Sequence, residues 1–175
     1  MSFDREGKDL SKFKKDYKVF IETGSENGGG INAALITGYD TIYSIEIDPK
    51  YYNICKERFK DNPNVNLILG SSDVELPKLL ETINEPFVMW LDAHWSADGY
   101  MGEKMHEFLP KELDVLLNHK DKFINSLLAI DDFNHYLYDR AFCVRMESKV
   151  KEINPNWNVH YYESECPGQI FLIGE

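Results

Sequence analysis

Short apolar runs alternate along this chain with longer segments whose apolar residues recur every three to four positions. Five apolar runs fit buried strands, at residues 19–22, 41–47, 65–69, 87–91 and 127–130. Alternation of strand-like and helix-like segments predicts an α/β fold with a parallel sheet. Two further strand-like runs, 157–162 and 169–173, are joined by the turn Cys166-Pro167-Gly168. This short turn suits an antiparallel pair.

The helical segments between these strands have recognisable ends. Residues 31–37 precede Gly38, and glycine is favoured just past a helix C-terminus. Asp48 and Pro49 suit the N-cap and the first position of a helix over residues 49–60. Three further helices are predicted: one capped by Asp73 and running to Ile83, one carrying Leu113, Leu116 and Leu117, and one over residues 138–153.

Together these elements predict a Rossmann-like, doubly wound α/β fold. Its seven-stranded sheet is expected to be mostly parallel, with an antiparallel C-terminal hairpin and helices on both faces. The chain has 175 residues, enough to bury a good core in one domain. We expect residues 17–175 to form this domain and residues 1–16 to form an N-terminal arm or docking helix.

The charge balance narrows the class of partner. The chain carries a net charge of −11, whereas proteins that bind nucleic acids neutralise phosphates with Lys and Arg. The densest basic run, Lys12 to Lys18, is interrupted by Asp16 and is interpreted as a solvated face. The composition therefore argues against a nucleic-acid partner.

Other features favour a cytoplasmic protein without a membrane partner. No apolar run reaches the ~20 residues that a membrane-spanning helix needs. The polar, charged N-terminus does not resemble a signal peptide. Three cysteines stand far apart in sequence, a pattern expected in a reducing compartment.

Four of the predicted strands end in an acid: Glu22, Glu46, Asp92 and Asp131. The carboxyl ends of parallel strands meet at one edge of the sheet, where doubly wound folds bind their ligands. Clustered carboxylates repel one another and need a ligand, a cation or a hydrogen-bond donor. The sequence thus predicts a ligand site at this edge.

A glycine-rich loop, residues 24–30, follows the first of these acids. A phosphate-binding P-loop is excluded because Gly30-Ile31 stands where Lys and Ser or Thr are required. A dinucleotide fingerprint fits Gly28-x-Gly30-x-x-Ala33, although it starts six residues after Glu22. A glycine-rich turn without a ligand is the third interpretation. Against it, Glu46 follows Gly24 by 22 residues, near the ~20 expected for an acid that binds ribose.

The order of motifs adds a family resemblance. The motifs are Glu22-Thr23-Gly24-Ser25 with Gly28 and Gly30, Tyr43-Ser44-Ile45-Glu46-Ile47-Asp48, Gly70-Ser71-Ser72, Trp90-Leu91-Asp92-Ala93-His94 and Ala129-Ile130-Asp131-Asp132-Phe133. Because these motifs occur in this order and at strand ends, the chain resembles class I S-adenosylmethionine-dependent methyltransferases over residues 17–175. Within that family its later motifs look like the branch that contains the small-molecule O-methyltransferases of the macrocin type and many uncharacterised relatives.

The resemblance implies S-adenosylmethionine as cofactor and assigns residues to it. Glu22 would hold the methionine end, Glu46 the ribose hydroxyls, and Ser71 and Ser72 the adenine edge, while Asp92 would face the sulfonium and the substrate. The full set implied for cofactor binding is Glu22, Gly24, Ser25, Gly28, Gly30, Glu46, Ile47, Ser71, Ser72 and Asp92. The family usually has an acid directly after the third-strand glycine, where this chain has Ser71. Asp73 is therefore interpreted as a helix N-cap.

Acids at the fourth and fifth strand ends form a second constellation. Asp92, Asp131 and Asp132 are candidate ligands for Mg²⁺, which prefers carboxylate oxygens and would activate a substrate hydroxyl. The competing interpretation is that one of the pair caps a turn. Asp92 and His94 are candidate catalytic residues. His94, two residues beyond Asp92, is a candidate general base, and His135 is a second candidate for that role. A metal ligand and an ordinary loop histidine are the alternative interpretations of His94. Trp95, Tyr100, Met101 and Met105 suit either an apolar substrate wall or ordinary packing.

The sequence therefore predicts a methyltransferase that acts on a hydroxyl oxygen of a small molecule, with Mg²⁺ as a candidate second cofactor. The short chain leaves little for a substrate domain, so a homodimer is expected to complete the pocket. Two alternatives stay open: an S-adenosylmethionine-binding protein without transferase activity, and an NAD-dependent oxidoreductase.

Overall fold

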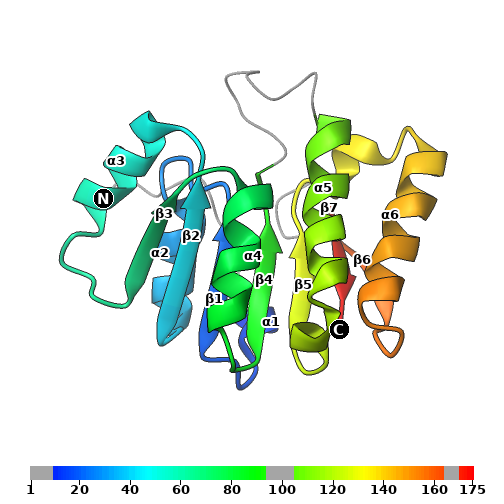
Figure 1. Ribbon diagram of the computed structural model, residues 1–175, viewed down its shortest axis with the longest axis horizontal. Helices are drawn as coiled ribbons and strands as arrows, with labels where there is room; N and C mark the ends of the chain where they lie inside the picture. The colour runs from blue at the N-terminus through cyan, green and yellow to red at the C-terminus, as the bar shows by residue number, and fades with distance from the viewer. Residues whose placement is uncertain (1–9, 94–104, 164–169) are drawn as a thin grey trace.

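The computed structural model describes residues 10–93, 105–163 and 170–175 (Figure 1). Seven strands form one sheet in the order β3-β2-β1-β4-β5-β7-β6. The strands are β1 (Val19–Thr23), β2 (Thr41–Glu46), β3 (Val65–Leu69), β4 (Phe87–Leu91), β5 (Leu127–Ile130), β6 (Val159–Glu163) and β7 (Ile170–Gly174). Strands β1 to β5 are parallel, and β7 runs antiparallel to both β5 and β6. The predicted fold class is confirmed.

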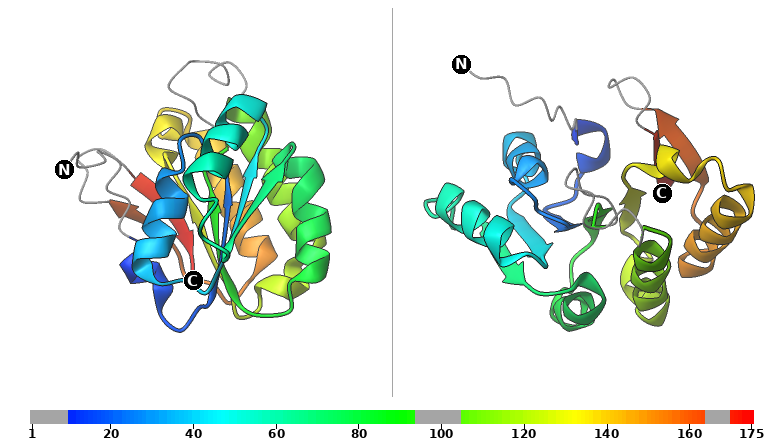
Figure 2. Two further views of the ribbon diagram at one scale, coloured as in Figure 1. Left: turned by 90° about the vertical axis from the view of Figure 1, so that its left-hand side faces the viewer. Right: turned by 90° about the horizontal axis from the view of Figure 1, so that it is seen from above.

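Helices cover both faces of this sheet. The α-helices of the described residues are α1 (Ser11–Lys14), α2 (Gly29–Thr37), α3 (Pro49–Arg58), α4 (Ser72–Thr82), α5 (Met105–Asn118) and α6 (Arg140–Ile153). Short 3-10 helices, η1 (Lys120–Phe123) and η2 (Phe133–Tyr136), flank β5. Figure 2 shows α1, α2 and α3 on one face and α4, α5 and α6 on the other.

The two faces carry separate hydrophobic cores. On one face, Phe20 and Trp90 of the sheet pack with Phe13, Ile31 and Phe59 from the helices. On the opposite face, sheet side chains pack with leucines of α4 and α5 and with α6. Because the central strands β1, β4 and β5 are buried along their whole length, they read as continuous apolar runs rather than as alternating ones.

Most predicted boundaries lie within two residues of those observed, and the departures have local causes. Helix α2 begins at Gly29, before the predicted start, because Gly28 adopts a left-handed conformation (φ 83°) at the N-cap. Helix α6 begins at Arg140 because Asp139 accepts a hydrogen bond from the amide of Phe142 at 3.0 Å. The predicted caps at Gly38 and Asp48 are confirmed.

The N-terminal segment touches the sheet through one helical turn. Phe13 of α1 is buried, and its ring meets the rings of Trp90 and Phe171 edge-on at centroid distances of 5.8 and 6.5 Å. Lys15 pairs with the Glu175 carboxylate at 2.6 Å, so this end of the chain is tied to the last strand. Within the described residues, no helix has the length and apolar character required to cross a membrane.

Candidate cofactor site

Glu22 lies at the carboxyl edge of the sheet with only 1% of its surface exposed. The parallel register places it beside Ser44 of β2, whose hydroxyl donates to Oε1 of Glu22 at 2.6 Å. The hydroxyls of Ser44 and Ser25 share a hydrogen bond at 2.5 Å. Since a buried carboxylate is costly without donors, these two serines hold the acid in one position.

The start of α2 lies against the same carboxylate. A Cβ atom added at Gly30 would stand 1.9 Å from Oε2 of Glu22, so no side chain fits there. The N-terminus of a helix carries a partial positive charge that favours a nearby anion. The glycine thus allows α2 to direct its positive end at Glu22.

Gly24 brings the loop close to the end of β4. Its backbone has φ 81°, and its amide donates to the carbonyl of Ile45 at 2.8 Å. A Cβ atom at this position would lie 2.7 Å from the carbonyl oxygen of Asp92. The loop therefore passes between the carboxyl ends of β2 and β4, where a side chain would block it.

Glu46 lies at the end of β2 and is 6% exposed. Its Oε2 accepts from the amide of Glu26 at 2.9 Å, and its Oε1 accepts from the amide of Asp48 at 2.8 Å. Each carboxylate oxygen can accept a second hydrogen bond, so Glu46 keeps capacity for a ligand with hydroxyl groups. Glu22 and Glu46 thus border the same glycine loop, as the sequence predicts.

Helix α3 holds the loop from outside. The Cys55 thiol donates to the carbonyl of Glu26 at 3.3 Å, and the Arg58 guanidinium donates to the carbonyl of Asn27 at 2.6 Å. Burial raises the pKa of Cys55 to about 12, and the negative charges of Glu22 and Glu46 act in the same direction. The thiol therefore stays neutral and serves as a donor. Sequence reasoning missed this contribution of α3, which follows only from the packing.

Two apolar side chains are exposed at the carboxyl ends of β2 and β3. Ile47 directly follows Glu46 and is 45% exposed, although it is apolar. Leu69, the register partner of Glu46 on β3, is 47% exposed. Two exposed apolar side chains beside a buried acid suit a planar ring with an attached sugar.

The serine pair opens α4. Ser71 occupies the N-cap position, Ser72 is buried, and Asp73 is the second residue of the helix. The prediction that Asp73 caps this helix is wrong, because the helix starts one residue before it. Asp73 instead accepts a hydrogen bond from the Ser71 hydroxyl and places a negative charge in the first turn, where the helix dipole favours it.

Backbone amides make the hydrogen bonds at the acids after β4 and β5. The amide of Asp92 donates to the carbonyl of Thr23 at 3.1 Å. Asp131 is buried, and its Oδ1 accepts from the amide of Asp132 at 2.7 Å. Among residues that the structure describes, no three His, Cys, Asp or Glu side chains gather in a way that would hold a metal ion. The predicted Mg²⁺ site therefore receives no support, and Asp131 fits the competing interpretation as a turn residue.

Several predicted residues fall outside the described parts of the chain. His94, Trp95, Tyr100 and Met101 are among them, and Met105 is described only through its backbone. His135 lies in η2 with an exposed side chain. The candidate general base and the candidate substrate wall accordingly stay predictions.

One buried acid was missed by the sequence reasoning. Glu112 of α5 is completely buried, although it carries a carboxyl group. A signal was present, because Glu112 interrupts the helical stripe formed by Leu109, Leu113 and Leu116. Burial raises its pKa to about 7, against the opposing effect of the nearby Ser72 and Thr23 hydroxyls. Thr23 and Ser72 both adjoin residues of the site described above.

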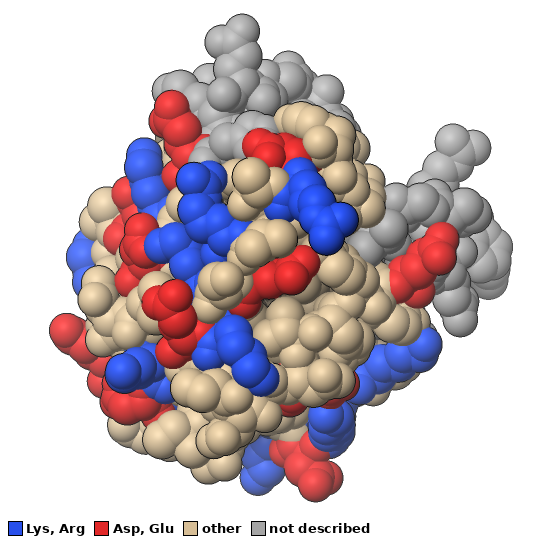
Figure 3. Space-filling model, turned by 90° about the vertical axis from the view of Figure 1, so that its right-hand side faces the viewer, with Lys and Arg blue, Asp and Glu red and all other residues tan. Residues whose placement is uncertain are grey.

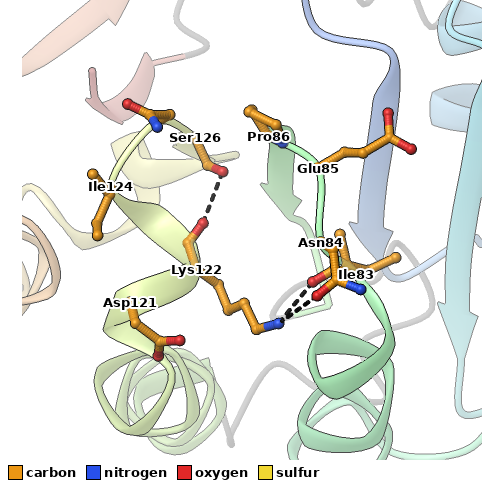
Figure 4. Close-up of a pocket in the computed structure, with 9 residues that line it drawn as sticks. Ile83, Asn84, Glu85, Pro86, Asp121, Lys122, Ile124 and Ser126 are labelled. Atoms are coloured by element: carbon orange, nitrogen blue, oxygen red, sulfur yellow. Dashed lines mark hydrogen bonds between the residues drawn. The ribbon is translucent and has the colours of Figure 1, made fainter.

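A pocket of about 240 Å³ lies elsewhere, before the amino ends of β4 and β5. Figure 4 shows Lys122 reaching across it to Ile83 and Asn84. Its ammonium donates to the carbonyl of Ile83 at 2.8 Å, so the basic group there is already engaged. This pocket is at the opposite edge of the sheet from Glu22 and Glu46 and takes no part in the site.

Sequence comparison gives no relative: no protein-family model and no curated protein matches the chain. Solved structures match it at low identity. An O-methyltransferase from Bacillus cereus in complex with SAH is 12% identical, with a TM-score of 0.70 over 99% of this chain and 82% of that one. The SAH-bound Podospora anserina methyltransferase PaMTH1 is 17% identical, with a TM-score of 0.61 over 94% of this chain and 74% of that one.

A third match is to fibrillarin from Aeropyrum pernix with bound S-adenosyl-L-methionine. It is 12% identical, with a TM-score of 0.60 over 90% of this chain and 66% of that one. These identities are low enough that the likeness concerns the fold alone. The chain thus has the fold of class I S-adenosylmethionine-dependent methyltransferases, and the macrocin-type resemblance stays a prediction.

Proposed function

We propose that this chain binds S-adenosylmethionine and transfers its methyl group to a hydroxyl oxygen of a small molecule. The observation that carries the proposal is the pair of buried acids, Glu22 and Glu46, fixed on either side of a loop whose glycines have no room for side chains. The structural neighbours that hold SAH or S-adenosylmethionine support the same cofactor.

Each part of the site suits one part of that cofactor. Glu22 offers a buried negative charge to the ammonium of the methionine end. Glu46 offers paired acceptors to the two ribose hydroxyls. Ile47 and the start of α4 at Ser71 and Ser72 are the residues proposed to contact the adenine ring.

The same geometry argues against a dinucleotide at Gly28 and Gly30. A pyrophosphate bound by a Rossmann fold sits at the N-terminus of the first helix. Here the Glu22 carboxylate already occupies that side of α2, within 1.9 Å of the Gly30 Cβ position. An added pyrophosphate would meet like charge, whereas a cofactor with an ammonium group would meet opposite charge. This favours S-adenosylmethionine over NAD.

A small molecule suits the surface better than a nucleic acid does. The net charge is −11, and a polyanion would be repelled unless a basic face collected it. Figure 3 shows acidic and basic side chains interspersed over the face that carries α6, without a basic tract. The proposal therefore takes a hydroxyl-bearing metabolite as the methyl acceptor, with a homodimer as the proposed assembly.

The chemistry needed from the protein is mostly positioning. Bound S-adenosylmethionine supplies an electrophilic methyl group, and transfer forms an oxygen–carbon bond while the sulfur–carbon bond breaks. Asp92, which follows β4 beside Gly24, is the residue proposed to orient the substrate hydroxyl. His94 is the proposed acceptor of the hydroxyl proton, since a neutral imidazole suits that task near pH 7.

The decisive test is calorimetric titration with SAH, S-adenosylmethionine and NAD. Both sulfur ligands are expected to bind, and Glu46→Gln is expected to weaken them at least about tenfold by removing one acceptor charge. Glu57→Gln serves as the matched control, because Glu57 is an exposed acid of α3 that pairs with Lys60. Binding of NAD alone would refute the proposal.

Methyl transfer needs a second assay. Release of SAH is measured over a panel of hydroxyl-bearing small molecules with the wild type and with Asp92→Asn. Turnover that falls in Asp92→Asn while SAH affinity holds supports a transferase. Tight SAH binding with no turnover on any acceptor favours the second candidate, a binding protein without transferase activity.

A further inference from the structure

Two buried serines connect the Glu22 carboxylate to the glycine loop, residues 24–30. Ser44 of β2 has no exposed surface, and Ser25 of the loop is 3% exposed. The Ser44 hydroxyl donates to Oε1 of Glu22 at 2.6 Å, and the hydroxyl oxygens of Ser44 and Ser25 are 2.5 Å apart. The three side chains thus form one hydrogen-bonded chain that leads from the acid into the loop.

The direction of this chain follows from the number of its protons. A serine hydroxyl has one proton to donate and two lone pairs to accept with. Ser44 gives its proton to the Glu22 carboxylate, so it must be the acceptor in its hydrogen bond with Ser25. Ser25 is therefore the donor in that bond, and its oxygen keeps only lone pairs for a further contact. We call this chain, from Ser25 through Ser44 to Glu22, the serine relay.

The backbone on either side of Ser25 is fixed on β2. Before it, the amide of Gly24 donates to the carbonyl of Ile45 at 2.8 Å. After it, the amide of Glu26 donates to Oε2 of Glu46 at 2.9 Å. Because the loop is held at both neighbours, the hydroxyl of Ser25 stays directed at β2, and the serine relay keeps its direction.

Both ends of the serine relay accept hydrogen bonds. Glu22 is a carboxylate, and Ser25 has already used its proton inside the protein. A ligand that contacts these ends has to supply donors, and an ammonium group supplies three together with a positive charge. A carboxylate or phosphate oxygen would instead bring an acceptor to acceptors and a negative charge to Glu22.

We propose that Ser44 is a positioning residue that makes the site selective for the amino group of its ligand. Through the serine relay it holds Glu22 as an acceptor and draws the Ser25 proton away from the ligand. Ser44 itself has no surface that a ligand could touch, so it acts only through these two side chains. This inference rests on the proposed function for the identity of the ligand.

Calorimetric titration compares SAH with the SAH analogue in which hydrogen replaces the amino group. The wild type is expected to bind SAH at least about tenfold more tightly than the analogue. Ser44→Ala removes the donor to Glu22 and releases the Ser25 proton. It is expected to lower this affinity ratio at least about threefold, by weakening the binding of SAH while the binding of the analogue holds.

Ser126→Ala is the matched control. Ser126 is also 3% exposed, and its hydroxyl accepts from the Phe87 amide at 3.2 Å, at the opposite edge of the sheet. This variant loses a buried hydroxyl as well, but it is expected to keep the wild-type affinity ratio. An unchanged ratio in Ser44→Ala would overturn the proposal, because a serine with a merely structural role would affect both ligands alike.

Two further measurements keep the test decisive. If Ser44→Ala does not fold, Ser25→Ala removes an acceptor from the loop and is expected to lower the ratio about twofold, and an unchanged ratio there would also overturn the proposal. Without any ligand, the carboxyl ¹³C chemical shift of Glu22 is expected to move in Ser44→Ala and to hold in Ser126→Ala. If the wild type bound neither ligand, the proposed function would fail, whereas this chemical shift would still decide whether the serine relay exists.

Discussion

Oε2 of Glu22 lies 1.9 Å from the position that a Cβ atom of Gly30 would occupy. The carboxylate cannot simply swing away, because it is buried and accepts a hydrogen bond from Ser44. In an ordinary helix, replacing glycine by alanine stabilises by about 1 kcal/mol. Here we expect the opposite sign: Gly30→Ala should destabilise by about 1–3 kcal/mol and reduce SAH affinity, as measured by urea unfolding and calorimetry.

Gly38→Ala separates stability from binding. Gly38 ends the same helix with φ 87°, and nothing lies within 4 Å of its Cβ position. Alanine there costs about 1–2 kcal/mol through the left-handed backbone alone. Unfolding at lower urea with unchanged SAH affinity is the expected outcome. Equal affinity in both glycine variants would show that Gly30 has no part in the site.

The contact between Arg58 and the glycine loop, residues 24–30, gives a prediction about cofactor binding. Its guanidinium donates to the Asn27 carbonyl at 2.6 Å, a contact that joins α3 to the glycine loop. Arg58→Ala is expected to weaken SAH binding several-fold, mainly through faster dissociation, because the loop loses a charge-assisted hydrogen bond worth about 1.5–3 kcal/mol. Stopped-flow dissociation kinetics would measure it.

Lys60→Ala is the control for Arg58→Ala. Lys60 pairs with Glu57 at 2.5 Å, but both side chains are more than half exposed, and such pairs contribute ~1 kcal/mol or less. Its SAH dissociation rate should match that of the wild type. If both substitutions raised the SAH dissociation rate equally, the cause would be the change in net charge and not the contact between Arg58 and the glycine loop.

Cys55 should be inert in the folded protein. Burial raises its pKa to about 12, and its thiol is committed to the Glu26 carbonyl. A thiol reagent at pH 8 is therefore expected to label it only as the chain opens, and saturating SAH should slow the labelling by stabilising the closed form. The rate is measured in a Cys143→Ala, Cys166→Ser background, where Cys55 is the remaining thiol of three. Rapid labelling without denaturant would contradict the buried placement.

The fold and the position of Glu22 and Glu46 at one edge of the sheet could be predicted from the sequence, because both depend on local patterns. Continuous apolar runs predict the positions of the central strands. Because β1 and β2 are parallel, the acids at their ends must lie at the same edge of the sheet as Gly24. The relation of Glu22 to Gly30 follows from the same geometry. The hydrogen bonds that these acids make cannot be predicted in this way, because Ser44 reaches Glu22 only through the register of β1 and β2.

The missed features depend on contacts between distant segments. Cys55 and Arg58 read as ordinary positions of an amphipathic helix, and nothing local shows that they reach residues 26 and 27. Glu112 gave a visible signal, an acid on an apolar stripe, but its neighbours lie on β1 and α4. Asp73 failed as a predicted cap because helix starts are uncertain by a residue or two when several polar residues adjoin.

The turn at Asp131 yields a prediction about metal binding. Its carboxylate accepts from the following amide, and Asp132 adopts φ 50°, as in a tight turn. We expect Asp131→Asn to lower stability by about 1 kcal/mol through weakening of this turn, with SAH affinity unaffected by EDTA or added Mg²⁺. A thermal-shift titration of Mg²⁺ with and without SAH measures the response. Stabilisation by Mg²⁺ that disappears in Asp131→Asn would restore the metal interpretation.

The buried acid of α5 should also be visible in the pH dependence of stability. The pKa of Glu112 rises from an ordinary 4.5 to about 7 in the folded chain, so the folded state binds the proton more tightly than the unfolded state. Between these values the folded state keeps a proton that the unfolded state has lost, and the free energy of unfolding falls as pH rises. The contribution is fully present below pH 4.5 and is lost by pH 7, a change on the order of 3 kcal/mol.

Glu112→Gln removes this titration while keeping the volume of the side chain. Relative to the wild type, its free energy of unfolding is expected to increase steadily from pH 4.5 to pH 7 and then level off, as measured by urea denaturation at closely spaced pH values. Glu107→Gln, on the exposed side of the same helix, controls for the lost charge. A constant difference between Glu112→Gln and the wild type across this range would mean that Glu112 is ionised in the folded protein.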